Sequence, residues 1–326
     1  MILVKIPMRS ELVIQFAHPA YRMAERFELQ KTGIQHFQTW TIEETQDRVT
    51  EADVLVISGF WRNELLGNAK KLTYIQSIGA GYDQFPLDVL EERGILLANA
   101  SGVNADAVSQ HAMALVLALI RHLPSGRDNQ RQHLWRDMIS ALNDREDDLC
   151  GHTMVIVGLG EIGSRLAKLA KAFGMTVIGV KRDAAHHDGS SDEVYTPSNL
   201  SQILGRADFV VLCCPLTSET AKIINANTFS SMKPSCYLIN VARGGCVDEP
   251  ELLAVLLEKR IAGAAIDHFW EEPLPEDSPF WDLDNLMITP HTGGETRKYE
   301  DNVVSILIEN LEHLWIQDGK LRNHIA

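Results

Sequence analysis

Cysteine is scarce in this sequence, and the cysteines present suit neither a disulfide framework nor a cysteine-based metal site. The chain has an odd number of them, five, at Cys150, Cys213, Cys214, Cys236 and Cys246. None has the C-x-x-C spacing that zinc ribbons and redox motifs use. We therefore expect reduced structural thiols and no metal.

Long hydrophobic runs are also missing. The longest uninterrupted apolar stretch, residues 112–120, is about half of the roughly 20 residues that a membrane-spanning helix requires. Near the N-terminus, Lys5, Arg9 and Glu11 interrupt any candidate signal core, and no small-residue cleavage site follows. These features predict a cytoplasmic protein without a membrane partner.

Positive charge is in deficit, because 30 Lys and Arg residues stand against 44 Asp and Glu residues and give a formal net charge of −14. Such a charge repels nucleic acid, so no nucleic-acid partner is expected, and an anionic substrate would need a local patch of positive charge. The length of 326 residues suits two domains, each with its own apolar core.

Short apolar runs alternate with helix-like stretches along the chain, which predicts parallel sheets with crossover helices. An N-terminal series covers residues 2–6, 54–57, 74–78 and 95–98, and a sharper series covers 154–158, 176–180, 209–214, 237–241, 262–267 and 286–290. Between the two series, a helical pattern over residues 104–123 ends at Pro124. The spacing of Val303, Ile306, Leu307, Leu311 and Leu314 predicts a last amphipathic helix.

A glycine motif, G-x-G-x-x-G, lies between one predicted strand and the following helix at Gly158, Gly160 and Gly163. In that context the first glycine permits a tight turn and the second lets a pyrophosphate approach the backbone. The third allows close packing of helix and strand. The helix N-terminus then supplies N–H groups and positive dipole to the phosphates, so the motif predicts dinucleotide binding.

The residue at the end of the next predicted strand bears on the choice of dinucleotide. An acidic residue there usually accepts the ribose hydroxyl of NAD, but this chain has Lys181 followed by Arg182. Two cations suit the 2′-phosphate of NADP, so we expect NADP rather than NAD as the cofactor. Two alternatives stay open: Asp183 serves as an NAD acceptor if the strand ends later, or both cations are solvated surface charges.

Four further strings occur in one order and spacing: CCPLTSET (213–220), INVARGGCVDE (239–249), AIDHFWEEPLP (265–275) and TPHTGG (289–294). Together with the glycine motif, they resemble the D-isomer-specific 2-hydroxy acid dehydrogenase family. The strings IGAGYDQ (78–84) and ANASGVNADAV (98–108) extend the likeness into the N-terminal half. In character the chain is most similar to the NADPH-dependent glyoxylate and hydroxypyruvate reductases of that family.

The resemblance implies a catalytic set of Arg243, Glu272 and His291. Hydride delivery to a ketone carbon leaves negative charge on oxygen, and a histidine near neutral pKa suits the protonation step. Glu272 hydrogen-bonded to His291 favours the imidazolium. The planar fork of Arg243 suits a carboxylate and its neighbouring carbonyl oxygen.

Further positions follow from the same likeness. Backbone N–H groups of Gly79, Ala80 and Gly81 are expected to bind the substrate carboxylate. The cofactor contacts implied are Gly158, Gly160, Glu161, Ile162, Gly163, Lys181, Arg182, Pro215, Thr217, Val241, Ala242, Arg243, Asp267, His291 and Gly293. In this set Asp267 is assigned to the nicotinamide carboxamide, although a simple strand-end cap is the alternative.

The predicted architecture is α/β, with two doubly wound parallel-sheet domains. A Rossmann-type cofactor domain (102–292) is inserted into a flavodoxin-like substrate domain (1–101 and 293–326), and the active site lies in the cleft between them. The family likeness implies a homodimer, with Trp135 either reaching the neighbouring subunit or buried in its own. The alternatives to an NADPH-linked reductase are an NAD-linked D-lactate or phosphoglycerate dehydrogenase and a dinucleotide-sensing co-repressor module.

Overall fold

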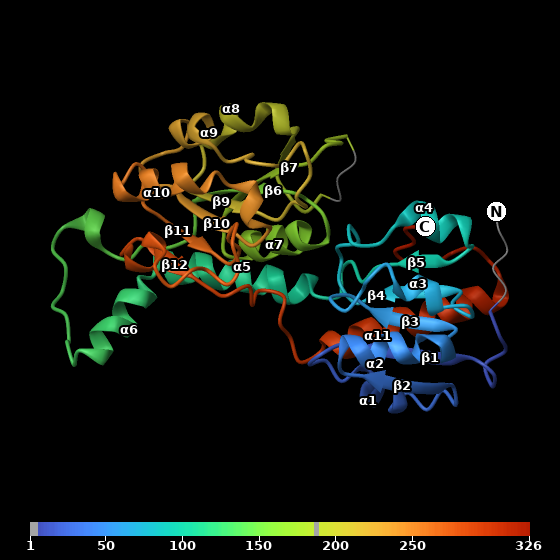
Figure 1. Cartoon of the computed structure of the whole chain (residues 1–326). Coiled ribbons are helices and arrows are strands. Elements are labelled where there is room, and N and C mark those ends of the chain that lie inside the picture. The colour runs from blue at the N-terminus through green and yellow to red at the C-terminus, as the bar shows by residue number, and fades with distance from the viewer. Residues whose placement is uncertain (1–5, 186–188) are drawn as a thin grey trace. The chain divides into compact units, whose positions relative to one another are not determined.

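The structure is a computed structural model that describes residues 6–185 and 189–326. It divides into two compact units, the first comprising Met1–Asn104 and Thr296–Ala326 and the second Ala105–Glu295. Each unit is built on one parallel sheet (Figure 1). The predicted pair of parallel-sheet α/β domains is thus confirmed. No helix in the described part of the chain is both long enough and apolar enough to cross a membrane.

The first unit has a five-stranded sheet in the order β2-β1-β3-β4-β5, the flavodoxin-like order. Its strands are β1 (Val13–Ala17), β2 (Gln35–Thr39), β3 (Val54–Ile57), β4 (Tyr74–Ser77) and β5 (Leu96–Ala98). Its helices are α1 (Met23–Glu28), α2 (Ile42–Arg48), α3 (Leu65–Asn68), α4 (Leu87–Glu92) and α11 (Tyr299–Ile316), with a short 3₁₀ turn at Val49–Glu51. In Figure 1 the red helix α11 lies beside the blue N-terminal strands, so the chain's end returns to this sheet.

The first strand of the chain differs from the sequence prediction. The predicted run 2–6 falls almost entirely outside the described residues, and Ile6 is buried but not in a strand. The first strand is instead β1, where a polar residue, Gln15, interrupts the apolar pattern. Gln15 is fully buried, and its amide donates to Thr39 Oγ1 and to the carbonyl of Thr45, both at 3.3 Å. These internal hydrogen bonds compensate for its burial.

The second unit has a seven-stranded sheet in the order β12-β11-β10-β9-β6-β7-β8, in which the direction of progression reverses at β6. The strands are β6 (Thr153–Val157), β7 (Thr176–Val180), β8 (Glu193–Tyr195), β9 (Phe209–Leu212), β10 (Tyr237–Asn240), β11 (Gly263–Ile266) and β12 (Leu286–Ile288). The helices are α5 (Ala105–Ile120), α6 (Leu123–Arg131), α7 (Glu161–Ala172), α8 (Leu200–Leu204), α9 (Ala226–Ser230) and α10 (Glu249–Leu257). Short 3₁₀ turns occupy Leu142–Asp144, Pro197–Asn199, Gly244–Cys246 and Pro279–Asp282.

Both faces of the second sheet are covered, as its near-continuous apolar strands predict. Along β6, Val155 and Val157 pack into one apolar cluster, whereas Met154 and Ile156 pack into the other. Helices α5 and α7 cover the face that carries Met154, and α10 lies over the opposite face. In open parallel sheets, ligands bind at the carboxyl ends of the two adjacent strands between which the strand order reverses. In this sheet those two strands are β6 and β9.

The prediction that one helix continues to Pro124 is wrong in its last turn. Helix α5 ends at Ile120, and Pro124 lies in the first turn of α6, where its missing N–H costs no hydrogen bond. After α6 the chain continues to residue 149 with most side chains exposed. We call residues 121–149 the arm; Figure 1 shows α6 within it, projecting beyond β12.

Candidate active site

The three predicted catalytic residues follow three neighbouring strands of the second sheet. Arg243 comes after β10, Glu272 after β11 and His291 after β12, and these strands pair in that order. Because the strands are parallel, their carboxyl ends lie along one edge. The side chains of all three residues line a single pocket of about 1050 Å³.

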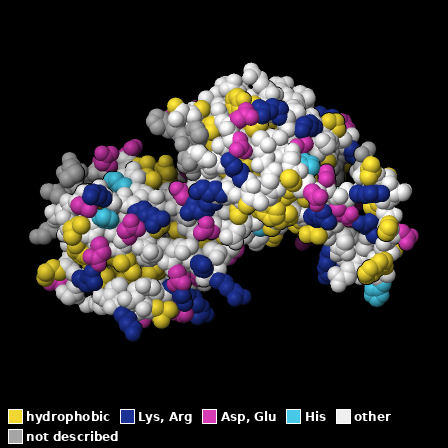
Figure 2. Space-filling view, turned by 180° about the vertical axis from the view of Figure 1, so that it is seen from behind, with side chains coloured by type: hydrophobic (Ala, Val, Ile, Leu, Met, Phe, Trp, Pro, Cys, Tyr) yellow, Lys and Arg dark blue, Asp and Glu magenta, His cyan; other side chains and the backbone are white. Residues whose placement is uncertain are grey.

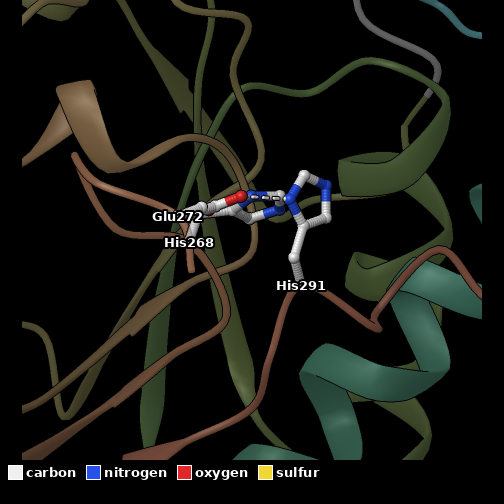
Figure 3. A group of neighbouring side chains, drawn as sticks. All are labelled: His268, Glu272 and His291. Atoms are coloured by element: carbon white, nitrogen blue, oxygen red, sulfur yellow. Dashed lines mark hydrogen bonds and ion pairs between the residues drawn. The ribbon is translucent and has the colours of Figure 1, made fainter. Parts of the chain in front are cut away.

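His291 and Glu272 form a close polar pair in this pocket. His291 Nδ1 lies 2.6 Å from Glu272 Oε2, as the dashed line in Figure 3 marks. Burial raises the pKa of Glu272, but the hydrogen bond and charge of His291 and the N–H of Phe269 outweigh it, so the pKa is lowered overall. Glu272 is therefore an anion at neutral pH. With Nδ1 engaged, Nε2 is the His291 nitrogen available to a ligand.

The backbone around His291 is held in an unusual conformation. His291 has φ 53°, in the left-handed region that side chains disfavour. Its N–H donates to the carbonyls of Asp267 and Thr289, both at 3.0 Å, which fixes the turn. The surrounding hydrogen bonds hold this strained residue, and such strain gathers at functional sites.

Asp267 organises the loop that carries His291. Its carboxylate is 2% exposed and accepts hydrogen bonds from Thr289 Oγ1 at 2.6 Å and from the N–H groups of Thr292 and Gly293 at 3.0 Å. Burial raises the pKa of Asp267, but the bonds from His111, Thr289 and the two N–H groups hold it far below the ordinary value. This position corresponds to the strand-end cap that the sequence left open, while a contact with nicotinamide stays a prediction.

One neighbour of the Glu272–His291 pair, His268, was not predicted from the sequence. Its ring packs on His291 with centroids 3.9 Å apart, and its Nδ1 lies 3.4 Å from Glu272 Oε1. Burial lowers the pKa of His268 to about 4, helped by the nearby charge of His291. The available signal was the H-x-x-x-E spacing of His268 and Glu272 within AIDHFWEEPLP.

The glycine motif has the geometry that a dinucleotide needs. Gly158, after β6, has φ 103°, and a Cβ there would lie 2.7 Å from the backbone nitrogen of Cys214. A Cβ on Gly163 would collide with the carbonyl of Gly158, so helix and strand pack closely. Gly160 caps α7 and has no atom within 4 Å of where a Cβ would stand. This open space at a helix N-terminus fits a pyrophosphate.

The other predicted cofactor residues lie on loops at the same edge of the sheet. Lys181 follows β7, is half-buried, and its N–H donates to the carbonyl of Tyr195. Arg182 and Asp183 are exposed, and Asp183 Oδ1 accepts from the N–H of Ala185 at 3.1 Å. Strand β7 ends at Val180 rather than two residues later, so Lys181 is the first residue after it.

The loop after β9 and the loop after β10 complete this group. Pro215 and Thr217 are exposed on the former, and Thr217 lines the pocket of Arg243. Val241 and Ala242 follow β10 and are buried. Glu161 and Ile162 are the first residues of α7. The N–H of Gly293 donates to the Asp267 carboxylate. Glu161 forms an ion pair with Arg165 in its own helix.

The predicted substrate loop belongs to the first unit. Gly79, Ala80 and Gly81 follow β4, and the carbonyls of Gly79 and Ala80 accept hydrogen bonds from the Ala100 N–H at 3.0 Å and from Asn99 Nδ2 at 2.6 Å. Among the described residues, none accepts a hydrogen bond from the three N–H groups of the loop. Such N–H groups suit an anion.

Comparison with known proteins identifies the chain's relatives. Residues 113–293 match the family model described as "D-isomer specific 2-hydroxyacid dehydrogenase, NAD binding domain". A glyoxylate reductase of Pyrococcus furiosus is 34% identical over 275 residues, 82% of this chain and 81% of that protein. A D-3-phosphoglycerate dehydrogenase of Methanocaldococcus jannaschii is 34% identical over 88% of this chain, which spans 54% of that longer protein. The crystal structure of a D-isomer-specific 2-hydroxyacid dehydrogenase family protein from Aeromonas salmonicida has a TM-score of 0.83 and 31% identity, covering 97% of this chain and 99% of that one.

Proposed function

The chain belongs to the D-isomer-specific 2-hydroxyacid dehydrogenase family, and on that premise we propose that it reduces a small 2-oxo acid to a D-2-hydroxy acid with NADPH. The substrate proposed is of the glyoxylate or hydroxypyruvate kind. The first unit would be the substrate domain and the second, which contains the matched residues 113–293, the cofactor domain. The observation that carries the proposal is the 2.6 Å contact between His291 and Glu272 in the pocket that Arg243 also lines.

Arg243 would bind and orient the substrate. Its guanidinium is an exposed cation on the pocket wall, and its planar fork matches a carboxylate with a carbonyl oxygen beside it. Holding both groups fixes the face of the carbonyl carbon and draws electron density toward its oxygen. The chain's net negative charge makes this local cation necessary for an anionic substrate.

His291 would supply the proton. Reduced nicotinamide, when bound, supplies a hydride to the carbonyl carbon, and the oxygen then requires H⁺. Because Glu272 occupies Nδ1, the imidazolium of His291 donates from Nε2 to that oxygen and leaves a D-2-hydroxy acid. The Glu272 carboxylate stabilises the imidazolium before transfer and fixes the ring plane.

Gly158, Gly160 and the N-terminus of α7 would hold the pyrophosphate. Lys181 and Arg182 would pair with the 2′-phosphate of NADPH, since neither can accept a ribose hydroxyl proton. Gly79, Ala80 and Gly81 would donate N–H groups to the substrate carboxylate.

A homodimer is proposed through the arm. Trp135 is 95% exposed and Met138 is 94% exposed, so the alternative that Trp135 is buried in its own subunit is wrong. Leu123, Leu134 and Leu142 are also exposed on the arm. Figure 2 shows hydrophobic side chains on the projecting segment at the right of the view. Apolar side chains gathered in this way typically mark an interface.

A phosphorylated 2-oxo acid, as for a phosphoglycerate dehydrogenase, is the second candidate substrate. It is favoured by Lys222, a second cation on the pocket wall, whose ammonium lies 3.3 Å from Asp248 and 4.9 Å from the ring centre of Trp270. Lys222 would contact the phosphate while Arg243 holds the carboxylate.

The test is a set of initial rates with glyoxylate, hydroxypyruvate, pyruvate and phosphohydroxypyruvate, each with NADPH and NADH. The proposal expects NADPH oxidation with the small unphosphorylated acids. A higher kcat/KM for phosphohydroxypyruvate would favour the second candidate. Tight NADPH binding without turnover of any acid would indicate a dinucleotide-sensing module instead.

A further inference from the structure

A group of metal-ligating side chains lies inside the proposed active site. In the described part of the chain, His268, Glu272 and His291 each offer a ligand atom, and these atoms all lie within 4.8 Å of one another (Figure 3). The scarcity of cysteine excludes a thiolate zinc site but says nothing of a site made from two imidazoles and a carboxylate. That ligand set is one that zinc proteins use.

His268 has no part in the proposed reaction, yet it is unusually placed. The side chain is 5% exposed, and no hydrogen bond to its buried Nδ1 is found among the residues that the structure describes. Buried polar atoms normally have partners, so an unpartnered one needs an explanation. Nδ1 lies 3.4 Å from Glu272 Oε1, and the ring packs edge-on against the ring of His291.

The other side of the His268 ring faces a second carboxylate. Nε2 lies 3.6 Å from Oδ2 of Asp267, whose pKa is held far below its ordinary value. In metal sites a ligating histidine commonly turns its second ring nitrogen toward a carboxylate, which fixes the tautomer and leaves the other lone pair for the metal. Asp267 and His268 have this orientation at 3.6 Å, which is longer than a hydrogen bond, and it leaves Nδ1 as the ligand atom.

We propose that His268, Glu272 and His291 bind a divalent transition-metal ion, with Zn²⁺ the preferred one. Imidazole nitrogen suits Zn²⁺, Ni²⁺ and Cu²⁺, whereas Mg²⁺ and Ca²⁺ prefer oxygen ligands. Bonds of about 2.0–2.1 Å place tetrahedral zinc ligands roughly 3.3 Å apart. The three ligand atoms lie within 4.8 Å of one another, so side-chain rotation would have to bring them to that separation, with the fourth position open to the pocket.

The metal would inhibit the enzyme, and this part of the inference rests on the proposed function. A metal ion bound to His291 and Glu272 would replace the 2.6 Å contact between Nδ1 and Oε2, so Glu272 would no longer orient the imidazole for proton transfer. Arg243 and Lys222, the cations on the same pocket wall, oppose binding electrostatically, so occupancy would be reversible and removed by chelators.

Metal binding can be measured without activity. The full chain, freed of any affinity tag, is titrated with Zn²⁺ in competition with a chromophoric chelator, and separately with Co²⁺ to record its visible absorption. We expect one equivalent of Zn²⁺ per chain. His268→Val removes one ligand without adding a polar group, and it should weaken Zn²⁺ binding by about tenfold or more.

The matched control replaces other histidines. His186 and His187 are adjacent in the sequence, outside the described residues, and the double variant His186→Gln/His187→Gln should bind Zn²⁺ as the unmodified chain does. Circular dichroism verifies the fold of each variant. If His268→Val is poorly folded, Glu272→Gln, which keeps the side chain's shape, takes its place in the binding assay.

The outcomes separate the two proposals. Absence of stoichiometric Zn²⁺ binding, or equal affinity in the unmodified chain and the folded His268→Val variant, overturns the metal site. Loss of Zn²⁺ binding in the His186→Gln/His187→Gln control overturns it as well. Zn²⁺ binding that depends on His268 but leaves the turnover of 2-oxo acids unchanged supports the metal site and contradicts the catalytic role of the Glu272–His291 pair.

Discussion

Thr289 donates its hydroxyl to Oδ1 of Asp267 at 2.6 Å, a bond that joins the end of β12 to the end of β11 just before His291. His291, the proposed proton donor, is therefore positioned by a neighbour in its own loop as well as by Glu272. Asp267 also accepts the N–H groups of Thr292 and Gly293, so the loop is bound on both sides of His291.

Removing this bond should lower the stability of the fold. Thr289→Val keeps the shape of the side chain but leaves a buried carboxylate one donor short. Hydrogen bonds to charged groups contribute about 1.5–3 kcal/mol, so the free energy of unfolding should fall by about that amount. Urea denaturation measures the loss. Thr289→Ser, which restores the hydroxyl, should recover most of it, and equal losses in both variants would assign the effect to packing.

The glycine motif supports a prediction about cofactor binding. A Cβ at Gly160 meets no protein atom within 4 Å, so Gly160→Ala should fold normally and yet lose NADPH affinity, because the methyl group stands where the pyrophosphate is expected. Fluorescence titration with NADPH measures the dissociation constant. Gly67→Ala, equally open but in the first unit, is the control. Unchanged NADPH affinity in Gly160→Ala would contradict the prediction that the pyrophosphate binds at this turn.

Cofactor preference depends on two cations after β7. Lys181→Ala/Arg182→Ala should weaken NADPH binding far more than NADH binding, by about a hundredfold or more, because two charge-assisted bonds to phosphate, each of about 1.5–3 kcal/mol, are lost. The ratio of the two dissociation constants is the readout. A similar loss for both cofactors would contradict a 2′-phosphate site.

The exposed apolar side chains of the arm predict that the chain forms a dimer. Trp135→Ser/Met138→Ser removes two large apolar side chains that are almost fully exposed within one chain. If the arm forms the dimer interface, analytical ultracentrifugation should show a dimer for the unmodified chain and a larger monomer fraction for the variant. Leu257→Ser, at an exposed leucine of α10, should leave the assembly unchanged. A monomeric unmodified chain would refute the dimer.

Much of the fold follows from the sequence because its strands are apolar on both faces. The runs that become β6, β7, β9, β10 and β11 needed no information beyond their composition and the turns between them. Strand β1 was missed because Gln15 interrupts its pattern, and only the structure shows Thr39 and Thr45 as partners of that amide. Periodicity cannot identify a polar residue whose burial depends on distant partners.

Three residues of the candidate site could be predicted from the sequence, and one neighbour of theirs could not. Arg243, Glu272 and His291 each lie within a distinctive string at a strand end, and parallel strands bring such ends together. His268 lies in the same string as Glu272, but it was not predicted, because a single histidine after a strand is compatible with a core, a surface or a ligand role. Its contact with His291 arises from the path of two loops, which local sequence does not determine.

The most direct test of the account replaces the proposed proton donor. His291→Ala should lower kcat for glyoxylate or hydroxypyruvate reduction by about 10²–10⁴-fold, the range typical of a lost general acid, while the dissociation constant for NADPH changes little. Stopped-flow measurement of NADPH oxidation under saturating substrate gives kcat, and fluorescence titration gives the cofactor affinity. A turnover rate equal to that of the unmodified enzyme would contradict the assignment of His291 and, with it, the proposed mechanism.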